Sequence, residues 1–127
     1  MMTIREKVRL NQMLVSGDIE NIRLAFEMII QLREGGNLIE RAKNRLHKMK
    51  IFFEEKCLEY DEKTKEHHTA MSPNSIGGSD PEYEKTEEEL YQRFSYYVGK
   101  LNDTKLKIRS FDMVYLEIQL FTKYFTT

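Results

Sequence analysis

A heptad repeat between Leu90 and Ile118 constrains this chain more than any other feature of its sequence. Eight of its nine positions are apolar or aromatic, and Thr104 is the exception. Spacings that alternate between three and four residues align side chains along one face of a helix, whereas a strand requires alternation with a period of two. The repeat therefore predicts a long helix with one buried edge. The nine positions are Leu90, Phe94, Tyr97, Leu101, Thr104, Ile108, Phe111, Tyr115 and Ile118.

The signals around this repeat predict one helix over residues 81–125. Pro81 marks the start, because proline in the first helical position loses no hydrogen bond. Gly99 and Ser110 are the expected sites of any kink. The alternating segment Leu116–Leu120 leaves a terminal strand open as an alternative.

A second long helix is predicted over residues 37–66, because no glycine or proline interrupts Leu38–Lys65. Its seam also alternates between spacings of three and four, and Lys56 is the one break in it. Two long helices joined by a short segment pack as an antiparallel hairpin. The seam positions are Ile39, Ala42, Leu46, Met49, Phe53, Lys56 and Tyr60.

Residues 1–36 are expected to form a small head of two helices. Thr3 is placed to cap the first helix, over Ile4–Ser16, and Asp18 to cap the second, over Ile19–Glu34. Gly17 separates the two, and Gly35 with Gly36 ends the second helix, with Asn37 as the next cap.

Apolar residues suggest which faces of the head are buried. In the first helix we expect Ile4 and Val8 to lie on the same side as Leu10–Leu14. The second helix has a broad apolar face and is expected to be the most buried segment. Its members are Ile22, Leu24, Phe26, Met28, Ile29, Ile30 and Leu32.

The sequence as a whole predicts a single all-α domain of four helices, in which a long coiled-coil-like hairpin carries a two-helix head. The chain has 127 residues, and a charged fraction of 32% suits helices that expose most of their circumference. The formal charge of −1 favours neither a nucleic-acid nor an acidic partner. The lone Cys57 and the absence of a leader-like or membrane-spanning stretch favour a cytoplasmic protein without membrane contact.

The segment 67–80 contains Pro73 and two of the six glycines, and Pro81 follows it directly. A phosphate-binding loop is disfavoured, because Asp80 and Glu82 stand where an anion would bind. The favoured interpretation is a flexible hairpin tip, and a partner-docking loop is the alternative.

No pattern supports catalysis, so we expect no enzyme activity, no cofactor and no small-molecule substrate. His67 and His68 are the one group that resembles metal ligands, but adjacent histidines point apart and further ligands are missing. A frayed helix end is the favoured interpretation of this pair, and His47 is expected on a solvated face. No histidine–aspartate pair that could activate a nucleophile is visible for Cys57, so we expect it to be a small buried residue of the packing.

Two basic segments are expected to meet at the head end of the hairpin. They have three interpretations: a solvated face, a site for an acidic protein, or a nucleic-acid site. The candidate nucleic-acid contacts are Arg41, Lys43, Arg45, Lys48, Lys105, Lys107 and Arg109.

The last helix is apolar around most of its circumference near Met113–Phe125, which is more than a small head can cover. The leading hypothesis is therefore a non-catalytic interaction, assembly or adaptor module that binds another protein or a second copy of itself. A nucleic-acid-binding regulator is the alternative. The candidate protein-binding residues are Tyr91, Tyr96, Met113, Leu116, Leu120 and Tyr124.

Overall fold

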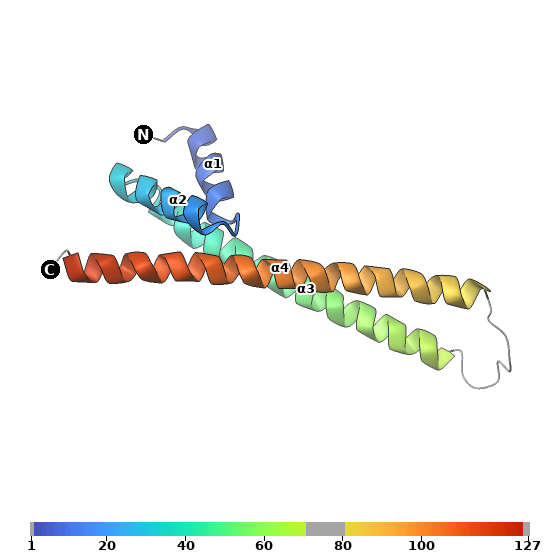
Figure 1. Cartoon of the computed structure of the whole chain (residues 1–127). Coiled ribbons are helices and arrows are strands. Elements are labelled where there is room, and N and C mark those ends of the chain that lie inside the picture. Colours follow the sequence, from blue (N-terminus) through green and yellow to red (C-terminus); the bar gives the residue numbers. More distant parts are fainter. Residues whose placement is uncertain (1, 71–80, 126–127) are drawn as a thin grey trace. The chain divides into compact units, whose positions relative to one another are not determined.

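The computed structural model describes the backbone of residues 2–70 and 81–125 and the side chains of residues 2–69 and 81–120. Within these ranges the chain forms four helices and no strand (Figure 1). The all-α prediction is confirmed, and the alternative of a terminal strand is wrong, because the last helix runs unbroken through Leu116–Leu120. The helices are α1 (Ile4–Leu14), α2 (Ile19–Leu32), α3 (Gly36–Ala70) and α4 (Pro81–Phe125).

The chain divides into two compact units. Unit 1 comprises residues 1–49 and 103–127, and unit 2 comprises residues 50–102. Helices α3 and α4 pack together as an antiparallel hairpin and contribute to both units, whereas α1 and α2 belong to unit 1. The predicted hairpin is confirmed.

Unit 1 contains the hydrophobic core, to which all four helices contribute. Phe26 of α2 is at its centre, and its ring lies 5.7 Å from Phe111 and 5.8 Å from Tyr115 of α4. Aromatic rings at such separations add to the free energy gained by burying their surface. The buried residues are Met2, Leu10, Leu14, Ile22, Ala25, Phe26, Ile29, Leu38, Ala42, Leu46, Phe111 and Val114.

The predicted caps of the head are present. The Thr3 hydroxyl accepts a hydrogen bond from the Glu6 amide at 3.1 Å, and Asp18 accepts from the Glu20 and Asn21 amides at 2.9 and 3.3 Å. These contacts satisfy amides that have no partner within their own helix. Gly17 adopts the left-handed conformation between the two helices, with φ of 81°.

Some predicted boundaries differ by two to four residues. Helix α2 ends at Leu32, because Arg33 turns into the left-handed conformation with φ of 52°. Helix α3 begins at Gly36, so Asn37 lies inside the helix and is not its cap. At its other end α3 continues to Ala70, beyond the predicted end at residue 66.

The predicted burial of the head was wrong in two places. Ile4 and Val8 are exposed, because they lie on a different face of α1 from Leu10 and Leu14. Helix α2 is only half buried. Its core face consists of Ile22, Ala25, Phe26 and Ile29, whereas Leu24, Met28, Ile30 and Leu32 are exposed.

Unit 2 is a two-helix contact along the predicted seams. Tyr60 of α3 stacks on Tyr97 of α4 with ring centroids 5.5 Å apart, and the Tyr60 hydroxyl accepts a hydrogen bond from Arg93 at 3.3 Å. Phe53 lies 6.3 Å from the same Tyr97 ring. Most seam residues here stay partly exposed, because one neighbouring helix cannot surround them.

The single break in the α3 seam, Lys56, is accommodated by local charge. Its ammonium group donates a hydrogen bond to Glu59 at 3.1 Å and lies 5.7 Å from the centre of the Phe52 ring. The hydrogen bond to Glu59 raises the pKa of Lys56 above its usual value. The lysine therefore lies in the seam with its charge balanced.

Two glycines should respond in opposite ways to replacement by alanine. A Cβ on Gly99 would meet nothing within 4 Å, so Gly99→Ala should raise the free energy of unfolding by about 0.5–1 kcal/mol. A Cβ on Gly17 would lie 2.9 Å from Cγ of Lys107 in a conformation that favours glycine, so Gly17→Ala should lower it by about 1 kcal/mol or more. Urea unfolding followed by circular dichroism measures both, and shifts in the same direction would contradict the description of one of the two sites.

Candidate protein-binding surface

An apolar stripe lies on the outer face of α4 in unit 1. It consists of Leu106, Met113, Leu116 and Leu120, whose side chains are between 46% and 60% exposed. Their spacings of seven, three and four residues place them on one face of the helix. We call this set the outer stripe.

The outer stripe lies on a different side of α4 from the core. Phe111 and Val114 are almost fully buried, whereas Met113 and Leu116, which are close to them in sequence, are about half exposed. Helix α4 thus has two apolar faces here, and the other helices of unit 1 cover only one. The surplus of apolar surface expected from the sequence is present.

The structure sorts the six predicted protein-binding residues into three groups. Met113, Leu116 and Leu120 share the outer stripe. Tyr91 and Tyr96 are exposed as well but belong to unit 2. The side chain of Tyr124 is outside the described residues.

The two tyrosines do not form one patch. Tyr91 and Tyr96 lie on opposite sides of the α4 seam, as their spacing of five residues implies. The Tyr96 ring lies 5.3 Å from Tyr97, and the Lys100 ammonium is 5.5 Å from its centre, so neighbouring side chains already contact this ring. Tyr91 is therefore the freer candidate of the two.

Leu106 is the member of the outer stripe that the sequence prediction missed. It precedes Met113 by seven residues, and this spacing was the available signal.

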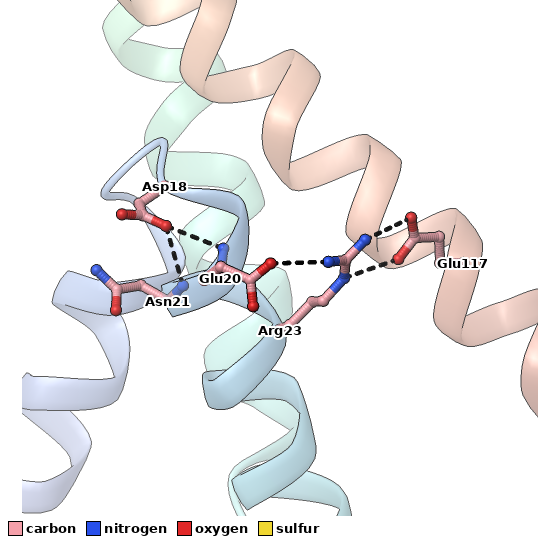
Figure 2. Close-up of polar contacts among 5 residues, drawn as sticks. All are labelled: Asp18, Glu20, Asn21, Arg23 and Glu117. Carbon is pink, nitrogen blue, oxygen red and sulfur yellow. Dashed lines mark hydrogen bonds and ion pairs between the residues drawn. The ribbon is translucent and has the colours of Figure 1, made fainter.

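An ion pair joins α2 to α4 at the edge of the outer stripe (Figure 2). Arg23 donates from Nε and Nη2 to the two carboxylate oxygens of Glu117, at 3.1 and 2.9 Å, and from Nη1 to Glu20 at 3.0 Å. Such two-point contact fixes direction as well as distance. Because Glu117 follows Leu116 directly, the pair ties α2 to the helix that carries the stripe.

The ion pair changes the titration of both partners. The hydrogen bond from Arg23 lowers the pKa of the Glu117 carboxyl, and the same hydrogen bond with the charge of Glu117 raises the pKa of the Arg23 guanidinium. A carboxyl whose pKa is lowered by folding stabilises the fold above the pKa it has in the unfolded chain. That stabilisation disappears as the pH falls through the folded value.

A further exposed apolar row lies on α2. Leu24, Met28 and Leu32 follow one another at intervals of four residues, and all three are exposed. This row faces away from the core and increases the apolar surface of unit 1.

The predicted basic residues do not form one patch. Arg41, Arg45 and Lys48 share an exposed flank of α3 and make no ion pair within the described part of the chain. Lys43 lies instead with its ammonium 6.0 Å from the centre of the Tyr115 ring, and Lys107 forms an ion pair with Asp103 at 3.3 Å.

The two remaining basic residues, Lys105 and Arg109, lie beside the outer stripe. Both are exposed, and neither has an ion-pair partner among the residues whose side chains are described. Helical spacing puts Arg109 between Leu106 and Met113 on the same face. The stripe therefore has a basic edge.

The sequence suggested a frayed helix end at His67 and His68, but both residues lie within α3 and contact α4. The His67 ring stacks on Tyr83 of α4 at 4.2 Å, and His68 contacts the Tyr83 hydroxyl at 2.8 Å and Glu87 at 3.3 Å. These contacts hold the last turns of α3 against the first turns of α4. Residues 71–80, which include the predicted hairpin tip and the Asp80 cap, lie outside the described residues.

The described side chains contain no group of three or more histidine, cysteine, aspartate and glutamate residues that could hold a metal ion. Over the same ranges no helix has the length and apolarity needed to cross a membrane. No protein-family model, curated protein or solved structure matches this chain.

Replacing Glu117 should weaken unit 1 in a manner that depends on pH. Glu117→Gln keeps the shape of the side chain but removes the charge, so the melting temperature should fall below that of the wild type at neutral pH. The difference in melting temperature between the two proteins should disappear at acidic pH, where the wild-type carboxyl is also neutral. Thermal unfolding followed by circular dichroism across this pH range measures it.

Glu27→Gln is the matched control, because Glu27 is exposed on the same helix as Arg23 and has no ion pair among the described side chains. A Glu117→Gln deficit that stays constant from neutral to acidic pH would contradict the assigned role of the carboxylate.

Proposed function

We propose that this chain is a non-catalytic interaction module, used in assembly or as an adaptor, that binds an amphipathic helix of another polypeptide along the outer stripe of α4. The supporting observation is the exposure of four large apolar residues at helical spacing on one rigid helix. A partner helix that presents a complementary apolar edge matches such a surface.

The position of the stripe suits a binding role. It lies on a helix whose opposite face is packed into the core through Phe111 and Val114. The Arg23–Glu117 pair restrains α2 beside it. A rigid apolar surface with a charged edge combines affinity with orientation.

The rest of the predicted function follows from the same proposal. The module needs no cofactor and no small-molecule substrate, and its binding energy comes from burying apolar surface. Tyr91 offers a secondary contact in unit 2. A cytoplasmic location remains a prediction of the sequence.

Photo-crosslinking in cells that naturally express the protein tests the surface. A photoreactive amino acid at position 106, 113 or 116 should give one and the same adduct, because these positions face one partner. The same residue at position 27, which is exposed on α2, should not give this adduct. Gel mobility and mass spectrometry of the adduct are the measurements.

A second substitution makes the test specific. Leu120→Glu, introduced together with the photoreactive residue at position 113, should reduce the adduct several-fold, because a charge in an apolar contact must be desolvated. Equal crosslinking from the stripe positions and from position 27 would refute the proposal.

Nucleic-acid binding is the second candidate, and the row Arg41, Arg45 and Lys48 favours it. These three cations are exposed on one flank of α3 and make no ion pair with any described residue. Against it, Lys43 and Lys107 are engaged elsewhere, so the combined patch expected from the sequence does not form.

This candidate makes a quantitative prediction about salt. If the row neutralises three phosphates of duplex DNA, the logarithm of affinity should fall with the logarithm of salt concentration with a slope of about −2.7. Replacing all three cations by glutamine should abolish the binding, whereas Lys63→Gln, at a lysine already paired with Glu59, should not. Fluorescence anisotropy measures this, and absent or salt-insensitive binding excludes the candidate.

A further inference from the structure

Helix α3 carries a second exposed row, in unit 2. Its five members follow at spacings of three or four residues and therefore share one face, on the far side from the seam residues Phe53 and Tyr60. The two apolar members, Ile51 and Leu58, are 54% and 63% exposed. The row consists of Ile51, Glu55, Leu58, Glu62 and Glu66, and we call it the acidic row.

The carboxylates of the acidic row differ in their ion pairing from neighbouring acids of α3. Neighbouring acids on α3 are paired: Glu54 with Lys50, and Glu59 with Lys56 and Lys63. Glu55, Glu62 and Glu66, in contrast, make no ion pair within the described ranges. Exposed aliphatic residues among unpaired like charges are typical of a contact surface, because neither feature helps the isolated helix.

The basic edge of the outer stripe has the opposite character. Lys105 and Arg109 also make no ion pair with any residue whose side chain is described, and Arg109 lies between Leu106 and Met113. In the acidic row, Glu55 lies between two aliphatic residues that are likewise seven positions apart. Seven residues rise about 10.5 Å along a helix, so the two apolar pairs can meet in register.

Charge selects the direction of such a contact. In antiparallel alignment the facing pairs are Leu106 with Leu58, Arg109 with Glu55, and Met113 with Ile51. The same alignment brings Lys105 within one turn of Glu62, so both unpaired cations meet unpaired carboxylates.

The parallel alignment of the same apolar residues is disfavoured. It would place Lys105 opposite Lys50, whereas the antiparallel alignment places Lys105 opposite Glu59. Like charges in this position oppose association, so charge favours the antiparallel direction.

We propose that the outer stripe of α4 binds the acidic row of α3 on a second copy of this chain, with the two helices antiparallel. This inference rests on the proposed function, because it names the partner of the same surface. The contact joins different surfaces on the two copies. If both surfaces of one copy bind the same partner, a closed dimer forms. If they bind two different partners, a longer chain of copies forms.

Charge reversal in the full chain tests the proposal. Arg109→Glu and Glu55→Arg each place like charges opposite each other, so each variant alone should associate about tenfold more weakly than the wild type. An equimolar mixture of the two should recover wild-type association, because each supplies the intact surface that the other lacks. Sedimentation velocity over a concentration series measures the association, and high salt should weaken it.

Arg9→Glu is the matched control, because it makes the same chemical change at an exposed residue of α1, which carries neither surface, and should leave association unchanged. Circular dichroism should show the same helix content in all variants, since the replaced residues are exposed.

Three results would overturn the proposal: a wild-type protein that stays monomeric at every concentration in low salt, reversal variants that associate as strongly as the wild type, or a mixture that remains weak. If the stripe positions then still crosslink to a different protein, the proposed function stands and only the identity of its partner changes. If they crosslink to nothing, both fail.

Discussion

The apolar seam of α4 is the constraint on which the rest of the structure depends. Through the described part of unit 2 the seam packs against α3, and its residues remain partly exposed around the stacked pair Tyr60 and Tyr97. Through unit 1 it is covered by helices α1 to α3, and Phe111 is buried against Phe26. The same repeat thus gives a thin contact in one unit and a complete core in the other, because burial depends on how many neighbours surround a position.

The outer stripe is a consequence of that arrangement. A helix can be surrounded on its core side and still carry large aliphatic residues on the side that faces water, and α4 does so from Leu106 to Leu120. Such exposure costs stability unless another surface covers it. The Arg23–Glu117 pair joins α2 to α4 at the boundary between the two faces. Binding and folding therefore use opposite faces of one helix.

Sequence periodicity predicted the helices and the inward edges of α3 and α4, because a heptad repeat sustained over four turns or more has one geometric interpretation. It failed for short helices. Ile4 and Val8 were grouped with Leu10 on a helix of 11 residues, where apolar residues occur on two faces. It also failed for His67 and His68, because their stacking on Tyr83 joins residues that are distant in sequence. Within the candidate site, Met113, Leu116 and Leu120 were predicted as exposed, whereas Leu106 and the acidic row were not.

The sequence by itself determined four helices, their caps at Thr3 and Asp18, and the inward-facing seam of the last helix, because these follow from local hydrogen bonding and from residue spacing. Only the tertiary structure decided which apolar residues stay exposed and which charges stay unpaired. Leu116 and Phe111 are equally suited to a core, and Arg109 and Arg23 are equally suited to an ion pair. These residues differ because distant segments of the chain supply neighbours to Phe111 and Arg23 but not to Leu116 and Arg109. The local sequence around each residue does not show which of them receives such neighbours.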